Sequence, residues 1–282
     1  MDGTSIDTVE VVAKQLGVAV EQVMIPVDHL FLSEAAVLPA IVVVRHADGA
    51  THFVVVWRRH GPWLQVMDPS IGRRWITCRR FAEEVFRHKL SVPAAQWRKW
   101  AASDDFLKPL CQRLSALGAS GHDATRLINP ALKDPGWFTF GALDAAIRLV
   151  QSVITAGGIT SGTQALKLLT ALFERTCTSA LDIHTLLPPD CWSATPDPAS
   201  VDPENQHLLL RGAVLLRVTR QPTGPVGAAA PEAQEAAPLS PELAAALKEK
   251  SLHPMRTIWD LLRVDGLLAP PALVGAMSIA VG

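Results

Sequence analysis

Two residues, His52 and Asp68, have the types and the spacing that point most directly to chemistry. An imidazole can act as a general base, and a carboxylate beside it can orient the ring and stabilise its protonated form. Their positions are symmetric about His60. In an antiparallel hairpin with a three- or five-residue loop centred there, the two side chains would stand opposite each other on one face of the sheet, about 4.5–5.5 Å apart at Cβ.

This inference depends on the number of residues in the loop. A loop with an even count, or a β-bulge, would place Asp68 on the other face of the sheet. In that case His52 is only the first residue of a strand, and Asp68 is a turn-forming residue before Pro69. The residues alone leave both interpretations open.

The elements that must position this pair are predicted from apolar runs. Thr4, with Asp7 three positions on, can cap an amphipathic helix that ends at Gly17. We expect a short helix over 27–36 and an antiparallel sheet behind one helix. The predicted strands are 18–25, 41–44, 52–57 and 63–67, with turns at 58–62 and 68–72 and Cys78 in a last strand.

The rest of the chain has a different pattern. Residues 94–180 have helical spacing of Leu, Ala and aromatic residues without a strand-like run, and 213–218 is an isolated strand candidate. We therefore predict an α+β protein with four segments. These are an antiparallel sheet lobe at 1–93, a mainly helical segment with one late strand at 94–220, a Pro- and Ala-rich linker at 221–240 and a C-terminal helix at 241–282.

Composition excludes several classes of function. The chain has 282 residues and 30.4 kDa, with 26 Lys and Arg against 27 Asp and Glu, so it has no basic field for nucleic acid. Mean hydropathy is +0.21, but the apolar run 267–282 is shorter than the roughly 20 residues that span a bilayer. Residues 149–166 contain polar residues and glycines, so they indicate a soluble helix, a break and a second helix. Four separated cysteines form no disulfide or zinc framework, which indicates a reducing compartment.

Several short motifs follow one another in the first 90 residues: Pro39-Ala40-Ile41, His52-Phe53-Val54-Val55, Asp68-Pro69-Ser70-Ile71-Gly72 and then Phe81. Together they resemble the cysteine peptidase domain that precedes bacterial ABC exporters and processes double-glycine leader peptides. Gly3-Thr4-Ser5 also resembles the segment before the central helix of that family. The resemblance covers about a third of the chain. It implies a papain-like fold, with His52 as general base and Asp68 as its orienting partner.

The chain departs from this family at the nucleophile. The cysteine of the family, and a glutamine shortly before it, lie upstream of the Gly-Thr-Ser segment, and this sequence begins at Met1. We therefore expect an incomplete, N-terminally truncated peptidase lobe that is inactive alone, because a base without a thiolate forms no acyl-enzyme. We expect the four cysteines to be small apolar side chains rather than replacement nucleophiles. They are Cys78, Cys111, Cys177 and Cys191.

Other motifs give weaker indications. A basic cluster, Arg73, Arg74, Arg79 and Arg80, could meet an acidic leader peptide but is typical of a solvated strand edge. We expect no metal site, because the histidines His29, His46, His60 and His88 show no ligand spacing. No phosphate-binding G-x-x-x-x-G-K-[ST] motif occurs, so we expect no cofactor in this chain, and ATP and Mg²⁺ would belong to exporter domains that it lacks.

The resemblance also implies partners and a location. They are a leader peptide, the transmembrane and nucleotide-binding parts of an ABC exporter, and the cytoplasmic face of the inner membrane, without nucleic acid. Residues 267–282 follow several basic residues, so the chain either stops inside a first transmembrane helix or ends in an ordinary core-facing helix. The alternatives to a peptidase are a non-proteolytic cargo-docking domain of a transporter and an unrelated helical interaction protein.

Overall fold

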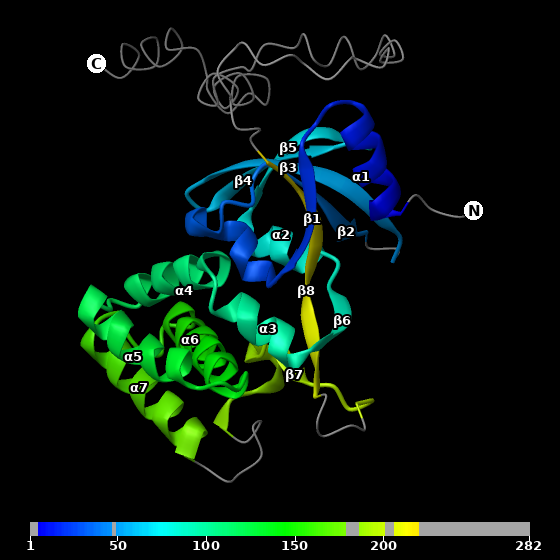
Figure 1. Cartoon of the computed structure of the whole chain (residues 1–282). Helices are drawn as coiled ribbons and strands as arrows, with labels where there is room; N and C mark the ends of the chain where they lie inside the picture. Colours follow the sequence, from blue (N-terminus) through cyan, green and yellow to red (C-terminus); the bar gives the residue numbers. More distant parts are fainter. Residues whose placement is uncertain (1–4, 47–48, 179–185, 201–205, 220–282) are drawn as a thin grey trace, which may run out of the picture. The chain divides into compact units, whose positions relative to one another are not determined.

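The computed structural model describes residues 5–46, 49–178, 186–200 and 206–219 (Figure 1). They belong to one compact unit, Met1–Thr223. The predicted linker and C-terminal helix, with the possible membrane segment 267–282, lie outside the described residues. The fold is α+β, as predicted, and its antiparallel sheet has eight strands, more than the sequence suggested. Its strands are β1 (Val20–Ile25), β2 (Ala40–Arg45), β3 (Thr51–His60), β4 (Trp63–Asp68), β5 (Gly72–Thr77), β6 (His88–Pro93), β7 (Ala194–Pro196) and β8 (His207–Val218).

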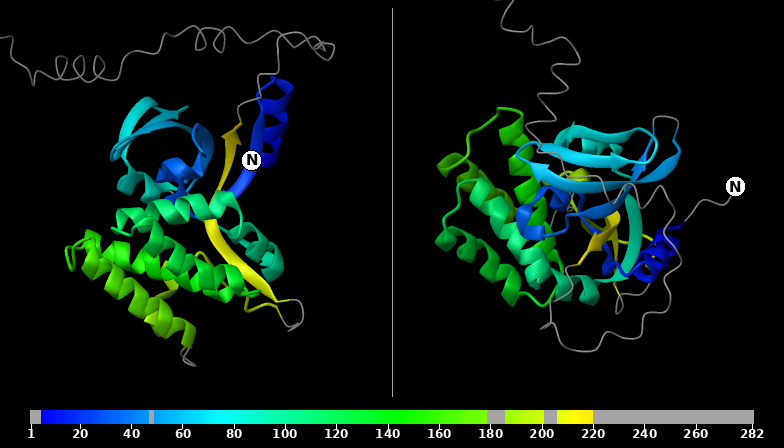
Figure 2. Two further views of the ribbon diagram at one scale, coloured as in Figure 1. Left: turned by 60° about the vertical axis from the view of Figure 1, so that its left-hand side comes forward. Right: turned by 90° about the horizontal axis from the view of Figure 1, so that it is seen from above.

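In the described part, the predicted helical segment is divided into several separate helices. They are α1 (Ile6–Gln15), α2 (Cys78–Glu84), α3 (Ala94–Ala101), α4 (Asp104–Ala116), α5 (Gly121–Lys133), α6 (Phe138–Thr155) and α7 (Thr163–Thr178). Short 3-10 helices occur at η1 (Val27–Phe31), η2 (Ser33–Ala35) and η3 (Pro189–Cys191). Figures 1 and 2 show α4–α7 gathered together, apart from strands β2–β5.

Four local predictions were wrong. Helix α1 is capped by the Ser5 side chain, which accepts from the Thr8 N–H at 3.2 Å, rather than by Thr4. Residues 27–36 form two 3-10 helices instead of one α-helix. Residues 58–60 continue strand β3, so the turn is only Gly61-Pro62, where Gly61 has φ +54°. Cys78 begins helix α2, because the Thr77 side chain caps the Arg80 N–H.

One face of the sheet is apolar and is covered by helix α2. Side chains two apart on a strand share a face, so the alternate residues of β2, β3 and β4 form one apolar surface. Phe81 of α2 and the following Val85 pack on it and are nearly inaccessible. The residues of β2, β3 and β4 in this core are Ala40, Val42, Val44, Val54, Val56, Leu64 and Val66.

Strand β8 joins the two parts of the unit, and it is not isolated as the sequence suggested. Its C-terminal half lies between β1 and β2, whereas its N-terminal half pairs with β6 and β7. The segment 94–220 therefore supplies a central strand to the sheet. Gly212 lies at the change of partners, where a Cβ would be only 2.3 Å from the Ile25 carbonyl oxygen. Only glycine fits this position without a backbone shift.

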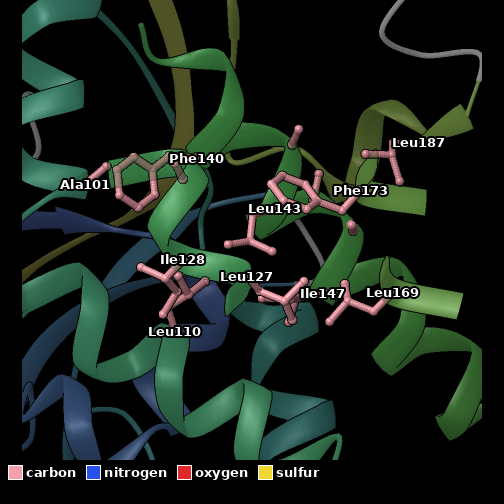
Figure 3. Packing of buried hydrophobic residues seen from close by; sticks show 14 of the residues in the cluster. Ala101, Leu110, Leu127, Ile128, Phe140, Leu143, Ile147, Leu169, Phe173 and Leu187 are labelled. Atoms are coloured by element: carbon pink, nitrogen blue, oxygen red, sulfur yellow. The ribbon is translucent and has the colours of Figure 1, made fainter. Parts of the chain in front are cut away.

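The helices have a separate apolar core (Figure 3). Phe140, Leu143 and Ile147 of α6 are fully buried, and they pack with Leu110 of α4 and Leu169 of α7. Among the described residues, α6 is also the one helix long and apolar enough to cross a membrane. Half of this helix is buried inside the protein.

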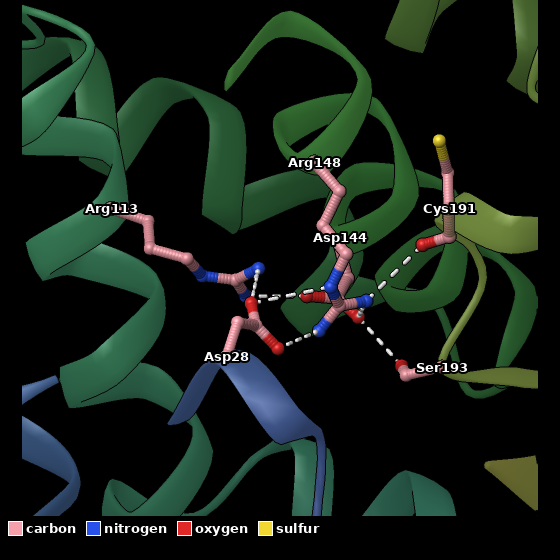
Figure 4. A network of polar contacts seen from close by, with 6 residues as sticks. All are labelled: Asp28, Arg113, Asp144, Arg148, Cys191 and Ser193. Carbon is pink, nitrogen blue, oxygen red and sulfur yellow. Dashed lines mark hydrogen bonds and ion pairs between the residues drawn. The ribbon is translucent and has the colours of Figure 1, made fainter. Parts of the chain in front are cut away.

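A network of buried charges links the helices to the sheet lobe (Figure 4). Asp144 of α6 is fully buried and accepts from Arg113, from Arg148 at 2.5 Å and from the Ser193 hydroxyl at 2.6 Å. Asp28 of η1 accepts from the same two arginines, at 3.0 Å from Arg113 and 3.2 Å from Arg148. Attraction by the arginines outweighs burial and lowers the pKa of both carboxyl groups.

Candidate active site

His52 and Asp68 lie on the same face of the sheet, although the hairpin differs from the one predicted. The loop between β3 and β4 has an even number of residues, Gly61 and Pro62, which alone would place Asp68 on the opposite face. A β-bulge between Val56 and Arg58 shifts the register by one residue and restores the parity. Continuing the register beyond Val55 and Met67 places Asp68 beside Val54, diagonal to His52.

The two side chains are in hydrogen-bonding contact. His52 Nε2 is 3.2 Å from Asp68 Oδ2, and the side chains are 22% and 2% exposed. They continue the buried rows of β3 and β4 beyond Val54 and Val66, so the core positions the pair at its rim. The contact confirms the predicted juxtaposition, and a catalytic role stays a prediction.

Asp68 is held as a carboxylate by its own turn. Its Oδ1 accepts from the Ser70 N–H at 3.0 Å and from the Ser70 hydroxyl at 2.6 Å. Burial would raise the pKa of Asp68, but the hydrogen bonds from Ser70 and His52 outweigh it and lower the pKa from 3.8 to about 2. Asp68 therefore carries its negative charge at any pH at which the protein would work.

The orientation of His52 leaves one ring nitrogen without a hydrogen-bond partner among the described residues. Because the Asp68 carboxylate accepts a hydrogen bond from Nε2–H, the neutral ring carries its proton on Nε2 and has a lone pair on Nδ1. Nδ1 is buried and has no hydrogen-bond partner among the described residues. The His46 ring stacks on the face of the His52 ring, with the two ring centroids 3.8 Å apart and the planes inclined by 8°. The ring of His52 is thus held by a carboxylate at its edge and an imidazole on its face.

The pair opens into a pocket of about 460 Å³ in which charges are balanced. Arg74 Nη2 is 2.7 Å from Glu84 and 3.8 Å from Asp68 Oδ2. Arg80 lies 3.8 Å from Glu84 and 3.3 Å from Glu83. Two members of the predicted basic cluster are therefore paired with acids at the site. Arg74 is partly buried, whereas Arg80 and its neighbour Arg79 are exposed, as expected for a solvated surface. Sequence reasoning missed Ser70 and Glu84, although Ser two residues after Asp is a usual turn signal.

No cysteine lines this pocket in the described part of the chain. Desolvation raises the pKa of all four thiols, and that of Cys177 rises to about 11. An activated nucleophile needs the opposite shift. The raised pKa values disfavour the thiolate form of all four cysteines. Cys111 and Cys177 are nevertheless exposed, so they are not the buried apolar side chains that the sequence suggested.

The described residues contain no group of three or more His, Cys, Asp or Glu side chains placed to hold a metal ion. The four histidines named from the sequence have other surroundings. His29 is buried beside Phe106, and burial lowers its pKa to about 4. His60 is near Trp75, His88 is against Phe86, and His46 stacks on His52.

Comparison with known protein families gives a match over the first part of the chain. No curated protein matches the chain. The model of the Peptidase C39 family matches residues 1–92, about a third of the sequence. The matched segment contains His52, Asp68 and helix α2, but it excludes the helical part and strand β8. This match supports a peptidase-type domain at residues 1–92.

Proposed function

We propose that residues 1–92 form the base-and-carboxylate half of a cysteine peptidase site for double-glycine leader peptides. One observation carries the proposal, namely the contact of His52 Nε2 with Asp68 while Nδ1 stays buried and unpaired. A general base needs this arrangement, in which one nitrogen is held and the other faces the proton to be removed. The family match over the same residues supports it.

The chemistry follows from these roles. Given a cysteine thiol that is not one of the four in this sequence, His52 Nδ1 would take its proton, and the thiolate would attack the carbonyl carbon of the second Gly of the pair. The C–N bond breaks, and the imidazolium gives its proton to the leaving amine. Water then hydrolyses the thioester, with His52 again as base. Asp68 keeps the ring oriented and stabilises its positive charge throughout.

A second function is non-proteolytic docking of cargo, and the placement of the cysteines away from the pocket favours it. None of them lines the pocket, and burial raises the pKa of each thiol. With His52 and Asp68 but without a thiolate, the pocket can hold a peptide and cannot cut it. An unrelated protein that resembles the peptidase by chance is disfavoured, because that alternative is expected to place His52 and Asp68 on opposite faces.

The wider context belongs to the same proposal. The domain would act at the cytoplasmic face of the inner membrane, beside the transmembrane and nucleotide-binding parts of an ABC exporter. ATP and Mg²⁺ would bind to those parts. The resemblance of the motifs around His52 and Asp68 supports this assignment.

Purified chain and a fluorescent peptide test both functions. The peptide carries a leader that ends in Gly-Gly, and a matched control has Val-Val at these positions. We expect saturable binding of the Gly-Gly peptide, weaker binding of the control and no cleavage in mass spectra. Equal binding of both peptides would overturn leader recognition. Cleavage that survives replacement of all four cysteines by serine would overturn the thiol-peptidase assignment.

A further inference from the structure

Two adjoining pockets lie between the sheet lobe and the helices, away from the His52 pocket. The first, of about 200 Å³, is lined mainly by apolar groups that include Trp97, Trp100 and Leu210. The second, of about 410 Å³, lies between η1, η3 and strands β6 and β8. Both are lined by Pro26, Ser193 and Arg211, so they adjoin at these residues.

The second pocket has an excess of positive charge. Its cationic side chains are Arg87, Lys89, Arg148 and Arg211, whereas its acids are Asp28 and Asp190. Arg148 is neutralised by Asp28 and Asp144. The other three cations form no ion pair within the described residues. An anion that enters this pocket therefore meets cations that are not already paired.

Lys89 and Arg211 are exposed cations that lie side by side on neighbouring strands. They are direct partners in the antiparallel register of β6 and β8. Side chains directly opposite on neighbouring strands have Cβ atoms about 4.5–5.5 Å apart, and like charges there destabilise the sheet. A carboxylate between them would remove this repulsion, and the planar guanidinium of Arg211 can donate two parallel hydrogen bonds to it.

The apolar pocket determines what the anion carries. Trp97 and Trp100 come from α3, which packs beside β6 and β8 (Figure 1). Arg211 lines both pockets, so a carboxylate held there leaves its attached group beside these indoles. We propose that the two pockets form one binding site for a small carboxylic acid with an alkyl or aryl group. This site is independent of His52 and Asp68.

Calorimetric titration of the whole chain with octanoate, butyrate and inorganic phosphate tests the proposal. Octanoate should bind at least about tenfold more tightly than butyrate, because each buried methylene adds affinity. Phosphate should bind more weakly than octanoate, because it leaves the apolar pocket empty. Equal affinities for octanoate and phosphate, or no binding of octanoate, would overturn the proposal.

Two variants test the cations. Lys89→Gln and Arg211→Gln change exposed side chains, so both should fold and should weaken octanoate binding at least about tenfold when combined. Arg217→Gln is the matched control on the same strand, because Arg217 pairs with Glu21 and lines neither pocket. Octanoate binding that is unchanged in the double variant would refute the cationic site. Binding only of a peptide with a free C-terminus, and not of octanoate, would refute a small-molecule ligand.

Discussion

Replacement of Asp144 by asparagine should destabilise the protein strongly. The side chain is fully buried and accepts from Arg113, Arg148 and Ser193. Asparagine keeps nearly the same volume and removes the charge, so the buried Arg113 and the half-buried Arg148 would share only Asp28. Breaking a buried ion pair from one side costs about 3–5 kcal/mol, because an uncompensated charge stays inside.

The assay is urea unfolding at pH 7, followed by circular dichroism. With a slope of about 2–3 kcal/mol/M for a unit of this size, the midpoint of D144N should fall by at least about 1 M. Asp104→Asn is the matched control, because Asp104 pairs with Lys108 on the surface and the side chains are 79% and 58% exposed. Its effect should stay below about 0.5 kcal/mol.

The pH dependence has a defined sign. The pKa of Asp144 is lowered in the folded protein, so its contribution to stability is fully present above about pH 3.8 and is lost as the pH falls below that value. The difference between the wild type and D144N should shrink in that range. A midpoint of D144N that equals that of D104N at pH 7 would refute the structural role of the network.

Three further predictions concern other parts of the molecule. Asp68→Asn should lower the free energy of unfolding at pH 7 by about 2 kcal/mol, and the difference should vanish as the pH falls from 3.8 toward about 2 in acid titrations of stability. An undiminished difference at pH 2 would contradict the lowered pKa. At pH 7 the thiols should react with a maleimide more slowly than free cysteine, Cys177 slowest, since its pKa is raised to about 11. A single fast thiol would identify a nucleophile that we do not assign. Gly212→Ala should destabilise the unit by at least about 2 kcal/mol in urea, because its Cβ would meet the Ile25 carbonyl oxygen, whereas Gly121→Ala in open space should change it little.

The sheet lobe and the His52–Asp68 contact were predictable because apolar alternation and turn residues are local signals. The route to the contact was not predictable. The bulge at Val56–Arg58 and the two-residue loop each reverse the face of the strand, and together they restore it. The sequence symmetry about His60 therefore predicted the correct face for Asp68, although it assumed a loop of the wrong length.

The long-range features could not be predicted in the same way. Strand β8 pairs with β1 and β2 across most of the chain length, and no local pattern specifies such partners. Only one pair of the charge network is visible in the local sequence. Asp144 and Arg148 lie four residues apart in an apolar helix. The other members of the network, Asp28 and Arg113, come from distant segments and join only when the two cores pack.

The state of the His52 ring tests the central claim most directly. Two-bond ¹H–¹⁵N correlation spectra of the imidazole at pH 8 distinguish the two neutral tautomers. Because Asp68 accepts from Nε2, we predict that the Nε2–H form with an unprotonated Nδ1 is populated almost exclusively, and we predict a larger share of the Nδ1–H form in Asp68→Ala. A wild-type His52 protonated on Nδ1, or one averaging freely between tautomers, would contradict a base that is held ready for a thiol.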